Sequence, residues 1–205
     1  MTDTTVFVID DDEAVRGALA LLLRSVGLQA MSFAAADAFL AAFEPEWSGC
    51  IVLDIRMLGM SGLELHETLL KRGCLLPVIF ITGHGDVPMA VRAMKTGAFD
   101  FIEKPFNDQD LLDRIHRALS FEADQRGRNQ LRGEVQERLQ SLTPREKEIM
   151  DRIVDGQANK VIAMDLGLSE RTVELHRAHV MNKMQAASVA ELVRLALAAG
   201  SQGEH

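Results

Sequence analysis

Short apolar runs and amphipathic segments alternate through the first 121 residues of the chain. The apolar runs predict five β-strands, at 6–9, 30–33, 51–53, 78–81 and 99–102. Segments with apolar positions at helical spacing lie between and after these runs and predict five helices, near 13–26, 36–43, 62–72, 86–96 and 107–121. Three of the runs are continuous enough for strands buried on both faces. Five successive β-α units predict an α/β domain with a doubly wound parallel sheet of five strands and helices on both faces.

The chain turns polar after residue 121. Charged side chains dominate 122–140 and are typical of a solvated face, while apolar residues such as Leu131 and Val135 recur on one helical stripe. We interpret 122–140 as a helical linker that extends the preceding helix. Gly127 and Gly133 predict that this linker is locally loosened.

No strand signal follows, and residues 141–205 predict an all-α domain of four helices. Thr143-Pro144-Arg145-Glu146 is a strong helix start, with threonine as N-cap, proline at the first helical position and glutamate closing a capping box. Gly156 and Gly167 end the first two helices, and Ser169 caps the third. A short helix, a glycine-containing turn and a longer helix (about 170–184) form a helix-turn-helix pattern, followed by a fourth helix near 188–199.

The net charge is informative about a nucleic-acid partner only when it is counted separately for the two predicted domains. The 205 residues carry a formal net charge of −8 and a pI near 5.3, which taken globally argues against a nucleic-acid partner. Residues 1–121, however, hold ten Lys and Arg against seventeen Asp and Glu, whereas 142–205 hold eight against nine. The global charge therefore does not exclude DNA binding by the second domain.

Composition excludes several other classes of protein. Two cysteines are too few for a disulfide framework or a structural zinc site. No apolar run approaches the roughly 20 residues of a membrane span, and residues 1–20 lack the order of a signal peptide. We expect a reduced, cytoplasmic protein with no membrane contact.

Polar residues gather at the ends of the predicted strands. Asp10, Asp11 and Asp12 end the first strand, Asp54 the third and Thr82 the fourth, and Lys104 follows the fifth. In a parallel sheet these ends meet at one edge, where clustered carboxylates favour a hard cation such as Mg²⁺. Asp54 is then the candidate nucleophile of a phosphoryl transfer, with Lys104 and the Thr82 hydroxyl neutralising charge on the phosphoryl oxygens.

These motifs resemble the receiver domain of two-component response regulators. The matching segments are Val8-Ile9-Asp10-Asp11-Asp12-Glu13, Leu53-Asp54-Ile55-Arg56-Met57, Ile81-Thr82-Gly83 and Glu103-Lys104-Pro105-Phe106. The resemblance implies a flavodoxin-like receiver at 1–121 in which Asp54 accepts phosphate from the phosphohistidine of a sensor histidine kinase. It further implies that Asp11 binds Mg²⁺ directly, that Asp10 binds it through water and that the main-chain oxygen of Arg56 completes the protein ligands.

The resemblance also implies a conformational switch. Thr82 and Phe101 form the switch pair, and the Lys104–Pro105 peptide bond is cis. Two residues depart from the family pattern: Leu58 stands where the family usually has proline, and Phe101 replaces the commoner tyrosine, losing its hydroxyl. Phosphorylation is expected to shift Thr82 and Phe101 inward and to reshape a face that includes Val91 and Lys95, through which the chain dimerises.

The second domain resembles the LuxR/NarL type of DNA-binding domain over about 138–200. The motifs that carry the likeness are Leu142-Thr143-Pro144-Arg145-Glu146, Asn159-Lys160-Val161-Ile162-Ala163, Leu166-Gly167-Leu168-Ser169, Thr172-Val173-Glu174-Leu175-His176 and Asn182-Lys183-Met184. The stretch 82–91 is similar to FixJ-type regulators. Together the two resemblances imply a transcription factor with a receiver (1–121), a linker (122–140) and a DNA-binding domain (141–205), which acts on promoter DNA and with RNA polymerase.

The third helix of the second domain is the predicted recognition helix. Val173, Val180 and Met184 fit a core-facing stripe, so Glu174 and Arg177 face outward, where they can read cytosine N4 and guanine or a phosphate. The full candidate set for DNA is Lys160, Arg171, Thr172, Glu174, Leu175, Arg177, His179 and Lys183, with Lys160, Arg171, His179 and Lys183 assigned to phosphates. His176 is expected to pack rather than read. In the fourth helix, Leu192 and Ala196 are candidates for a dimer contact.

Two other functions fit parts of the pattern. An aspartyl-phosphate hydrolase also has an aspartate nucleophile at a strand end, but it usually carries a second aspartate two residues on, where this chain has Arg56. A constitutive DNA binder with an inactive receiver would share every motif of the second domain. The leading interpretation is a phosphorylation-switched DNA binder that is not a dedicated enzyme.

Overall fold

The computed structural model describes residues 4–83 and 87–200 and divides into two compact units, Met1–Arg126 and Gly127–His205. Residues 84–86, part of the stretch that resembles FixJ-type regulators, lie outside the described residues. The expected elements are present in the expected order, with ends that agree to within one or two residues for nearly every helix and strand. No helix among the described residues has both the length and the apolar character needed to cross a bilayer.

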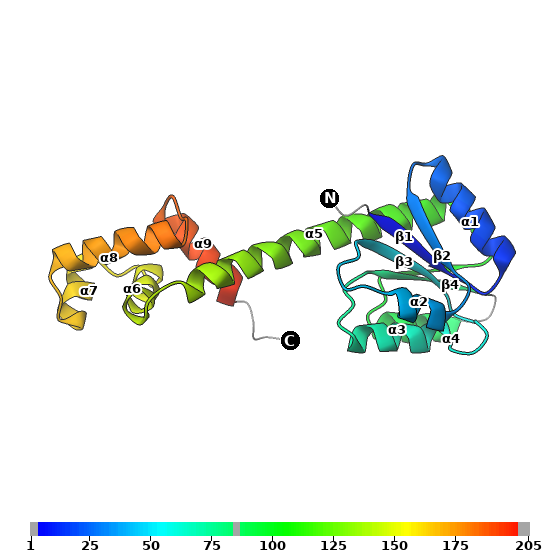
Figure 1. Ribbon diagram of the computed structural model, residues 1–205, viewed down its shortest axis with the longest axis horizontal. Helices are drawn as coiled ribbons and strands as arrows, with labels where there is room; N and C mark the ends of the chain where they lie inside the picture. The colour runs from blue at the N-terminus through cyan, green and yellow to red at the C-terminus, as the bar shows by residue number, and fades with distance from the viewer. Residues whose placement is uncertain (1–3, 84–86, 201–205) are drawn as a thin grey trace. The chain divides into compact units, whose positions relative to one another are not determined.

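The first unit is built on a parallel sheet, as predicted. Its strands are β1 (Thr5–Ile9), β2 (Gln29–Phe33), β3 (Gly49–Asp54), β4 (Val78–Thr82) and β5 (Asp100–Glu103), in the order β2-β1-β3-β4-β5 (Figure 1). β1, β3 and β4 are almost entirely buried, as their continuous apolar runs require, whereas β2 and β5 at the edges are partly exposed. This order confirms the doubly wound, flavodoxin-like fold and puts the ends of β1, β3 and β4 side by side.

Helices cover both faces of the sheet. On one face α1 (Glu13–Ser25) and the first turns of α5 (Asp108–Gln140) bury residues such as Leu23 and Ile115. On the other, α2 (Ala36–Ala42), α3 (Gly62–Lys71) and α4 (Val87–Lys95) close a second core around Phe39 and Phe80 (Figure 1). Asp12 caps α1 and a Ser61–Glu64 capping box starts α3. Both local signals were readable in the sequence.

α5 corrects the prediction of a loosened linker, while its charged side chains, apart from Glu122, are exposed or partly exposed as expected. The helix is continuous from Asp108 to Gln140, through Gly127 and Gly133. Glu122 is buried. Its carboxylate is satisfied by Ser48 Oγ, which donates at 3.2 Å, and by Arg126 Nε, which lies 3.1 Å away. Val135 is fully buried in the core of the second unit. Packing at these positions offsets the roughly 1 kcal/mol that each helical glycine costs.

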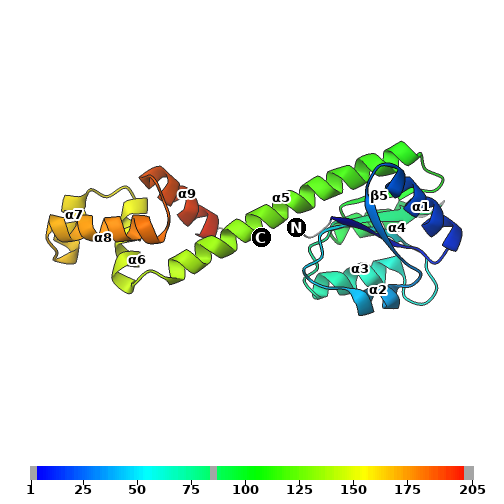
Figure 2. The same cartoon turned by 45° about the horizontal axis from the view of Figure 1, so that its top comes forward.

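The second unit is all-helical and has its own core. Its helices after α5 are α6 (Pro144–Val154), α7 (Asn159–Leu166), α8 (Glu170–Lys183) and α9 (Val189–Gly200) (Figure 2). The Thr143–Glu146 capping box, the left-handed Gly167 after α7 and the Ser169 cap of α8 are all present. α7, its turn and α8 form the predicted helix-turn-helix.

Gly62, the first residue of α3, fits directly against the strand that carries Asp54. A Cβ at Gly62 would lie 2.2 Å from the main-chain oxygen of Asp54. We expect Gly62→Ala to displace Asp54 and to lower the free energy of unfolding by about 1–3 kcal/mol or more. Gly17→Ala is the matched control, since the added methyl would meet no atom within 4 Å other than its chain neighbours and the backbone of its own helix, and α1 gains about 0.5–1 kcal/mol. Denaturant unfolding followed by the fluorescence of Trp47 measures both, and equal stability of the two variants would contradict the close approach.

Candidate functional site

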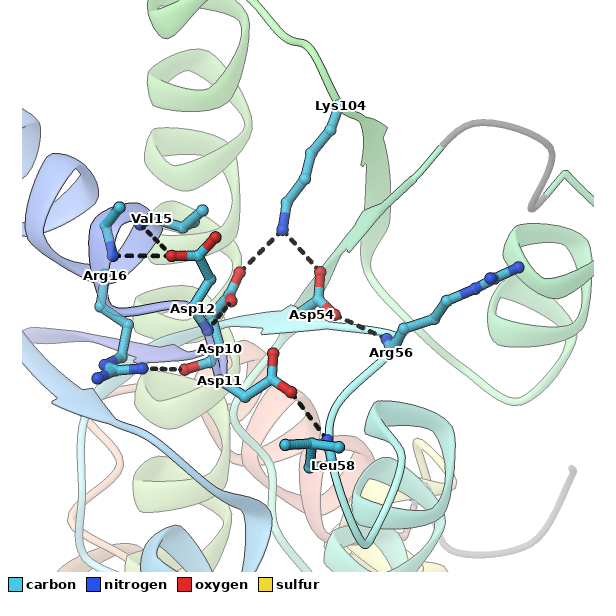
Figure 3. A network of polar contacts seen from close by, with 10 residues as sticks. Asp10, Asp11, Asp12, Val15, Arg16, Asp54, Arg56, Leu58 and Lys104 are labelled. Carbon is cyan, nitrogen blue, oxygen red and sulfur yellow. Dashed lines mark hydrogen bonds and ion pairs between the residues drawn. The ribbon is translucent and has the colours of Figure 1, made fainter.

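Three strand ends bring an acidic cluster and one lysine together. Lys104 Nζ lies 2.8 Å from Asp54 Oδ1 and 2.9 Å from Asp10 Oδ2 (Figure 3). Asp10 follows β1 directly, Asp54 ends β3, and Lys104 follows β5, so three segments far apart in the sequence supply the triad. The Lys104–Pro105 peptide bond is cis, which confirms the expectation. The juxtaposition that the sheet-edge argument predicted is therefore present.

The environment of Asp54 suits a carboxylate nucleophile. The residue is 7% exposed, and its Oδ2 accepts a hydrogen bond from the main-chain N–H of Arg56 at 2.7 Å. Burial raises the pKa of Asp54, and the hydrogen bond and charge of Lys104 partly offset that rise. Burial also opposes the charge of Lys104, but its hydrogen bonds to Asp54 and Asp10 outweigh burial and raise the pKa of the ammonium. Lys104 thus opposes the effect of burial on the Asp54 carboxylate.

The three consecutive aspartates after β1 have different surroundings. Asp10 is 1% exposed, and its Oδ1 accepts from the N–H of Asp12 at 2.9 Å. Asp11 is exposed, and its Oδ2 accepts from the N–H of Leu58 at 2.9 Å. Asp12 is the α1 cap, accepting from the N–H groups of the first turn. Arg16, which the motifs did not single out, donates to the main-chain oxygen of Asp10 at 2.8 Å (Figure 3).

The oxygen ligands at this edge of the sheet suit Mg²⁺ better than a cation that protein side chains must enclose completely. Within residues 4–83 and 87–200, no three His, Cys, Asp or Glu side chains are close enough to enclose a metal ion by themselves. Mg²⁺ does not need such a cage, because it keeps several waters and takes one or two carboxylates together with phosphate oxygens. Asp10, Asp11 and Asp54 offer hard oxygen ligands of this kind from adjacent strand ends.

The two residues of the expected switch lie on neighbouring strands. Thr82 ends β4 and is buried, and its hydroxyl donates to the main-chain oxygen of Gly83 at 3.0 Å. Phe101 is partly buried on β5 and packs against the α2–α3–α4 core. The N–H of Lys104 donates to the oxygen of Thr82 at 2.7 Å, which ties the switch threonine to the lysine. Val91 and Lys95 of α4 are exposed.

The recognition helix buries the predicted stripe and exposes most of the predicted DNA contacts. Val173, Val180 and Met184 are buried, whereas Glu174 and Leu175 are exposed. The other candidates divide as follows: Lys160, Arg171 and His179 are exposed, and Thr172, Arg177 and Lys183 are partly exposed. Met181, on the same helix, is partly buried against the domain core. His176 Nδ1 is buried with no hydrogen-bond partner among the described residues, in keeping with a packing role.

Lys183 is bound within its own domain. Its Nζ lies 2.6 Å from Oε2 of Glu146 and 3.2 Å from the main-chain oxygen of Ser141. Glu146 is 4% exposed and also accepts from the N–H of Thr143 at 2.8 Å, and His179 Nδ1 lies 3.9 Å from its other oxygen. The sequence signalled the capping glutamate but not its partner, which comes from 37 residues further along. This ion pair joins the start of α6 to the end of the recognition helix.

Leu192 corrects the expected dimer contact on α9. The side chain is 0% exposed and lies in the core of its own unit with Ile149 and Ile153 of α6. It is therefore unavailable to a second copy of the chain. Ala196 remains partly exposed, and among the described large apolar side chains of α9, Val189 and Leu197 are exposed.

Acid titration gives a test of the Glu146–Lys183 pair. The hydrogen bonds from Lys183 and Thr143 lower the pKa of Glu146 to about 2. Because this folded-state pKa lies below the ordinary value, Glu146 stabilises the fold above about pH 5 and loses that contribution as the pH falls toward 2. We expect Glu146→Gln to be less stable than the unmodified chain near neutral pH and nearly equal to it near pH 2.

Denaturant unfolding followed by circular dichroism at a series of pH values measures this difference. Glu148→Gln is the matched control, because Glu148 lies on the exposed side of the same helix and pairs with Arg145 at 2.7 Å. A stability difference between Glu146→Gln and the unmodified chain that persists unchanged at acid pH would contradict the ion-pair role.

Comparison with known proteins matches both units. Residues 6–116 match the family model described as the response regulator receiver domain, and residues 140–196 match that of the bacterial regulatory proteins of the luxR family. The transcriptional regulatory protein FixJ of Azorhizobium caulinodans is 53% identical over 95% of this chain and 92% of that protein. The response regulator TodT of Pseudomonas putida is 42% identical over 94% of this chain and 85% of its own length.

Solved structures agree with the sequence comparison. The response regulator StyR has a TM-score of 0.86 and 45% identity, covering 95% of this chain and 98% of its own. Full-length FixJ from B. japonicum has a TM-score of 0.62 and 43% identity, covering 99% of this chain and all of its own. These relatives are regulators rather than dedicated enzymes, which favours the switched DNA binder over the hydrolase.

Proposed function

This chain belongs to the FixJ-like two-component response regulators, which are phosphorylation-activated transcriptional regulators, and from that premise we propose that Asp54 is its phosphoacceptor. The observation that carries the proposal is the position of Asp54 at the end of the central strand, 2.8 Å from Lys104 Nζ. Asp10 and Asp54 both contact Lys104. Asp10 follows β1 rather than the central strand and is 1% exposed against 7% for Asp54, which suits it to holding a metal-bound water rather than to attack.

The transfer is a displacement at phosphorus. A carboxylate oxygen of Asp54 attacks the phosphorus of the kinase phosphohistidine, the phosphorus–nitrogen bond breaks, and the electron pair leaves with the imidazole nitrogen. Lys104 then moves from the free carboxylate to the charge of the transferred group, and the Thr82 hydroxyl donates to it. Bound Mg²⁺, held by Asp10, Asp11, Asp54 and the main-chain oxygen of Arg56, would supply further neutralisation of the phosphoryl oxygens.

The response follows from the same two contacts. Once Thr82 turns toward the phosphoryl group, the space it leaves admits Phe101, and the exposed surface with Val91 and Lys95 on α4 changes shape. Two receivers then pair through that surface in a symmetric dimer. Pairing brings two DNA-binding units to one two-fold site and raises their combined affinity by effective concentration. The near-neutral second domain makes this gain necessary, because eight basic against nine acidic residues in 142–205 leave a single copy with no net positive charge to hold phosphates.

The proposed DNA interface is the exposed side of α8 with its neighbours. Glu174 and Arg177 read base edges in the major groove, with Thr172 and Leu175 beside them. Lys160, Arg171 and His179 contact phosphates. The remaining partners are the cognate sensor histidine kinase and RNA polymerase, and promoter binding places the protein in the cytoplasm.

Phosphorylation followed by DNA selection tests the proposal. The full chain, treated with acetyl phosphate and Mg²⁺, is mixed with fragments of its own genome, and bound fragments are footprinted, while light scattering gives the mass of the free protein. We expect a shift from monomer to dimer and a protected two-fold site. A monomer that binds DNA identically with and without phosphate would favour a constitutive DNA binder with an inactive receiver.

A further inference from the structure

The loop between β3 and α3 supplies a hydrogen-bond donor to the acidic site that proline could not supply. The main-chain N–H of Leu58 donates to Oδ2 of Asp11 at 2.9 Å, across 47 residues of sequence (Figure 3). Proline, which response regulators usually carry at this position, has no N–H. The geometry points to Leu58 as a positioning residue, whose main-chain N–H holds the Asp11 carboxylate in place for a divalent cation.

The side chain of Leu58 does not explain its position. It is 86% exposed, the largest exposure among the large apolar residues that the structure describes. Its contribution to the site is therefore made by the backbone. Any residue with a main-chain N–H could donate in its place, and proline is the exception.

Asp11 is the carboxylate that most needs such a support. It lies exposed after β1, where a side chain has several rotamers open to it. The bond from Leu58 selects one of them. In Figure 3 the second oxygen of Asp11 is turned toward the part of the site where Asp10 and Asp54 lie.

The other two carboxylates of the site, Asp10 and Asp54, have both oxygens engaged in hydrogen bonds. Both oxygens of Asp10 accept bonds, from Asp12 and Lys104, and both oxygens of Asp54 accept bonds, from Lys104 and Arg56. Leu58 occupies only one oxygen of Asp11. The other oxygen is thus oriented toward the site and ready to bind a metal. A charge-assisted bond to a ligating carboxylate is strong, and removing such a support typically weakens metal binding about 10- to 100-fold.

Leu58→Pro and Leu58→Ala separate the N–H from the side chain. The inference rests on the proposed Mg²⁺ site, so calorimetric titration of the full chain with Mg²⁺ is the direct measurement. We expect Leu58→Ala to bind Mg²⁺ as the unmodified chain does and Leu58→Pro to bind it at least about tenfold more weakly. Leu58→Pro binding as tightly as Leu58→Ala, or more tightly, would overturn the positioning role. An unmodified chain that takes up no Mg²⁺ would instead overturn the metal site itself.

A second measurement does not depend on how the proline variant folds. Amide hydrogen exchange of Leu58 is read by NMR in chains that keep Leu58. We expect exchange to be slow in the unmodified chain and in Asp12→Asn, and to accelerate in Asp11→Ala, which removes the acceptor. Equal exchange rates in Asp11→Ala and Asp12→Asn would show that Asp11 does not engage the Leu58 N–H and would refute the inference.

Discussion

Asp54→Asn is expected to abolish phosphoryl uptake completely. Asparagine has the size of aspartate, and its single side-chain oxygen can still accept from the N–H of Arg56, while the oxygen that accepts from Lys104 is replaced by an NH2 group. It lacks the anionic oxygen that attacks phosphorus. The full chain is incubated with acetyl phosphate and Mg²⁺, and its intact mass is measured. The unmodified chain gains one phosphoryl group and Asp54→Asn gains none.

Asp12→Asn controls for the loss of a nearby negative charge. Asp12 caps α1, and asparagine caps helices about as well as aspartate does. We expect this variant to take up phosphate like the unmodified chain. An equal mass gain in Asp54→Asn would place the phosphoryl group elsewhere and would refute the assignment of Asp54.

Arg177→Ala is expected to cause the largest loss on the DNA side. Arg177 is partly exposed on α8, one turn after Glu174, where its guanidinium can bind guanine bidentately. Truncation should cost about 1–3 kcal/mol of binding free energy per protomer and relax the preference at one base pair in each half-site. Fluorescence anisotropy with a duplex selected by the phosphorylated chain, and with its single-base variants, measures both effects. A loss that is equal for every sequence would show that Arg177 contacts a phosphate.

Lys183→Met and Lys160→Met test which of the two lysines contacts a DNA phosphate, through the salt dependence of binding. The ammonium of Lys183 is bound to Glu146 and Ser141, whereas Lys160 at the start of α7 is exposed. Removing one phosphate contact should reduce the steepness of log affinity against log salt by about 0.9 for each bound protomer. We expect that decrease for Lys160→Met and an unchanged slope for Lys183→Met. A lowered slope in Lys183→Met would show that the ion pair opens on DNA.

Apolar periodicity and capping residues were sufficient to predict the elements of both units. The uninterrupted runs of β1, β3 and β4 gave the central strands, and the Ser61 and Thr143 capping boxes gave helix starts to the residue. Because the carboxyl ends of parallel strands meet at one edge of the sheet, the sequence also predicted that Asp10, Asp54 and Lys104 lie together. Parallel strands of known order leave few other arrangements, which explains why that part of the site was predictable.

Contacts that depend on tertiary geometry were not predictable in this way. The pairing of Glu146 with Lys183, and of Leu58 with Asp11, joins segments whose local patterns carry no sign of each other. Glu122 looked like part of a solvated face because its partner Ser48 lies 74 residues away. The apolar residues of α9 were compatible both with the domain core and with a dimer contact. Only the packing against α6 shows that Leu192 belongs to the core.

Affinity for one selected duplex, measured with and without phosphoryl donor, tests most directly whether phosphorylation of Asp54 switches DNA binding. The full chain and Asp54→Asn are titrated side by side at one salt concentration. We expect phosphorylation to tighten binding of the unmodified chain about a hundredfold or more, as pairing of two DNA-binding units allows, and to leave Asp54→Asn unchanged. Equal affinity of the unmodified chain in both states would contradict the switch.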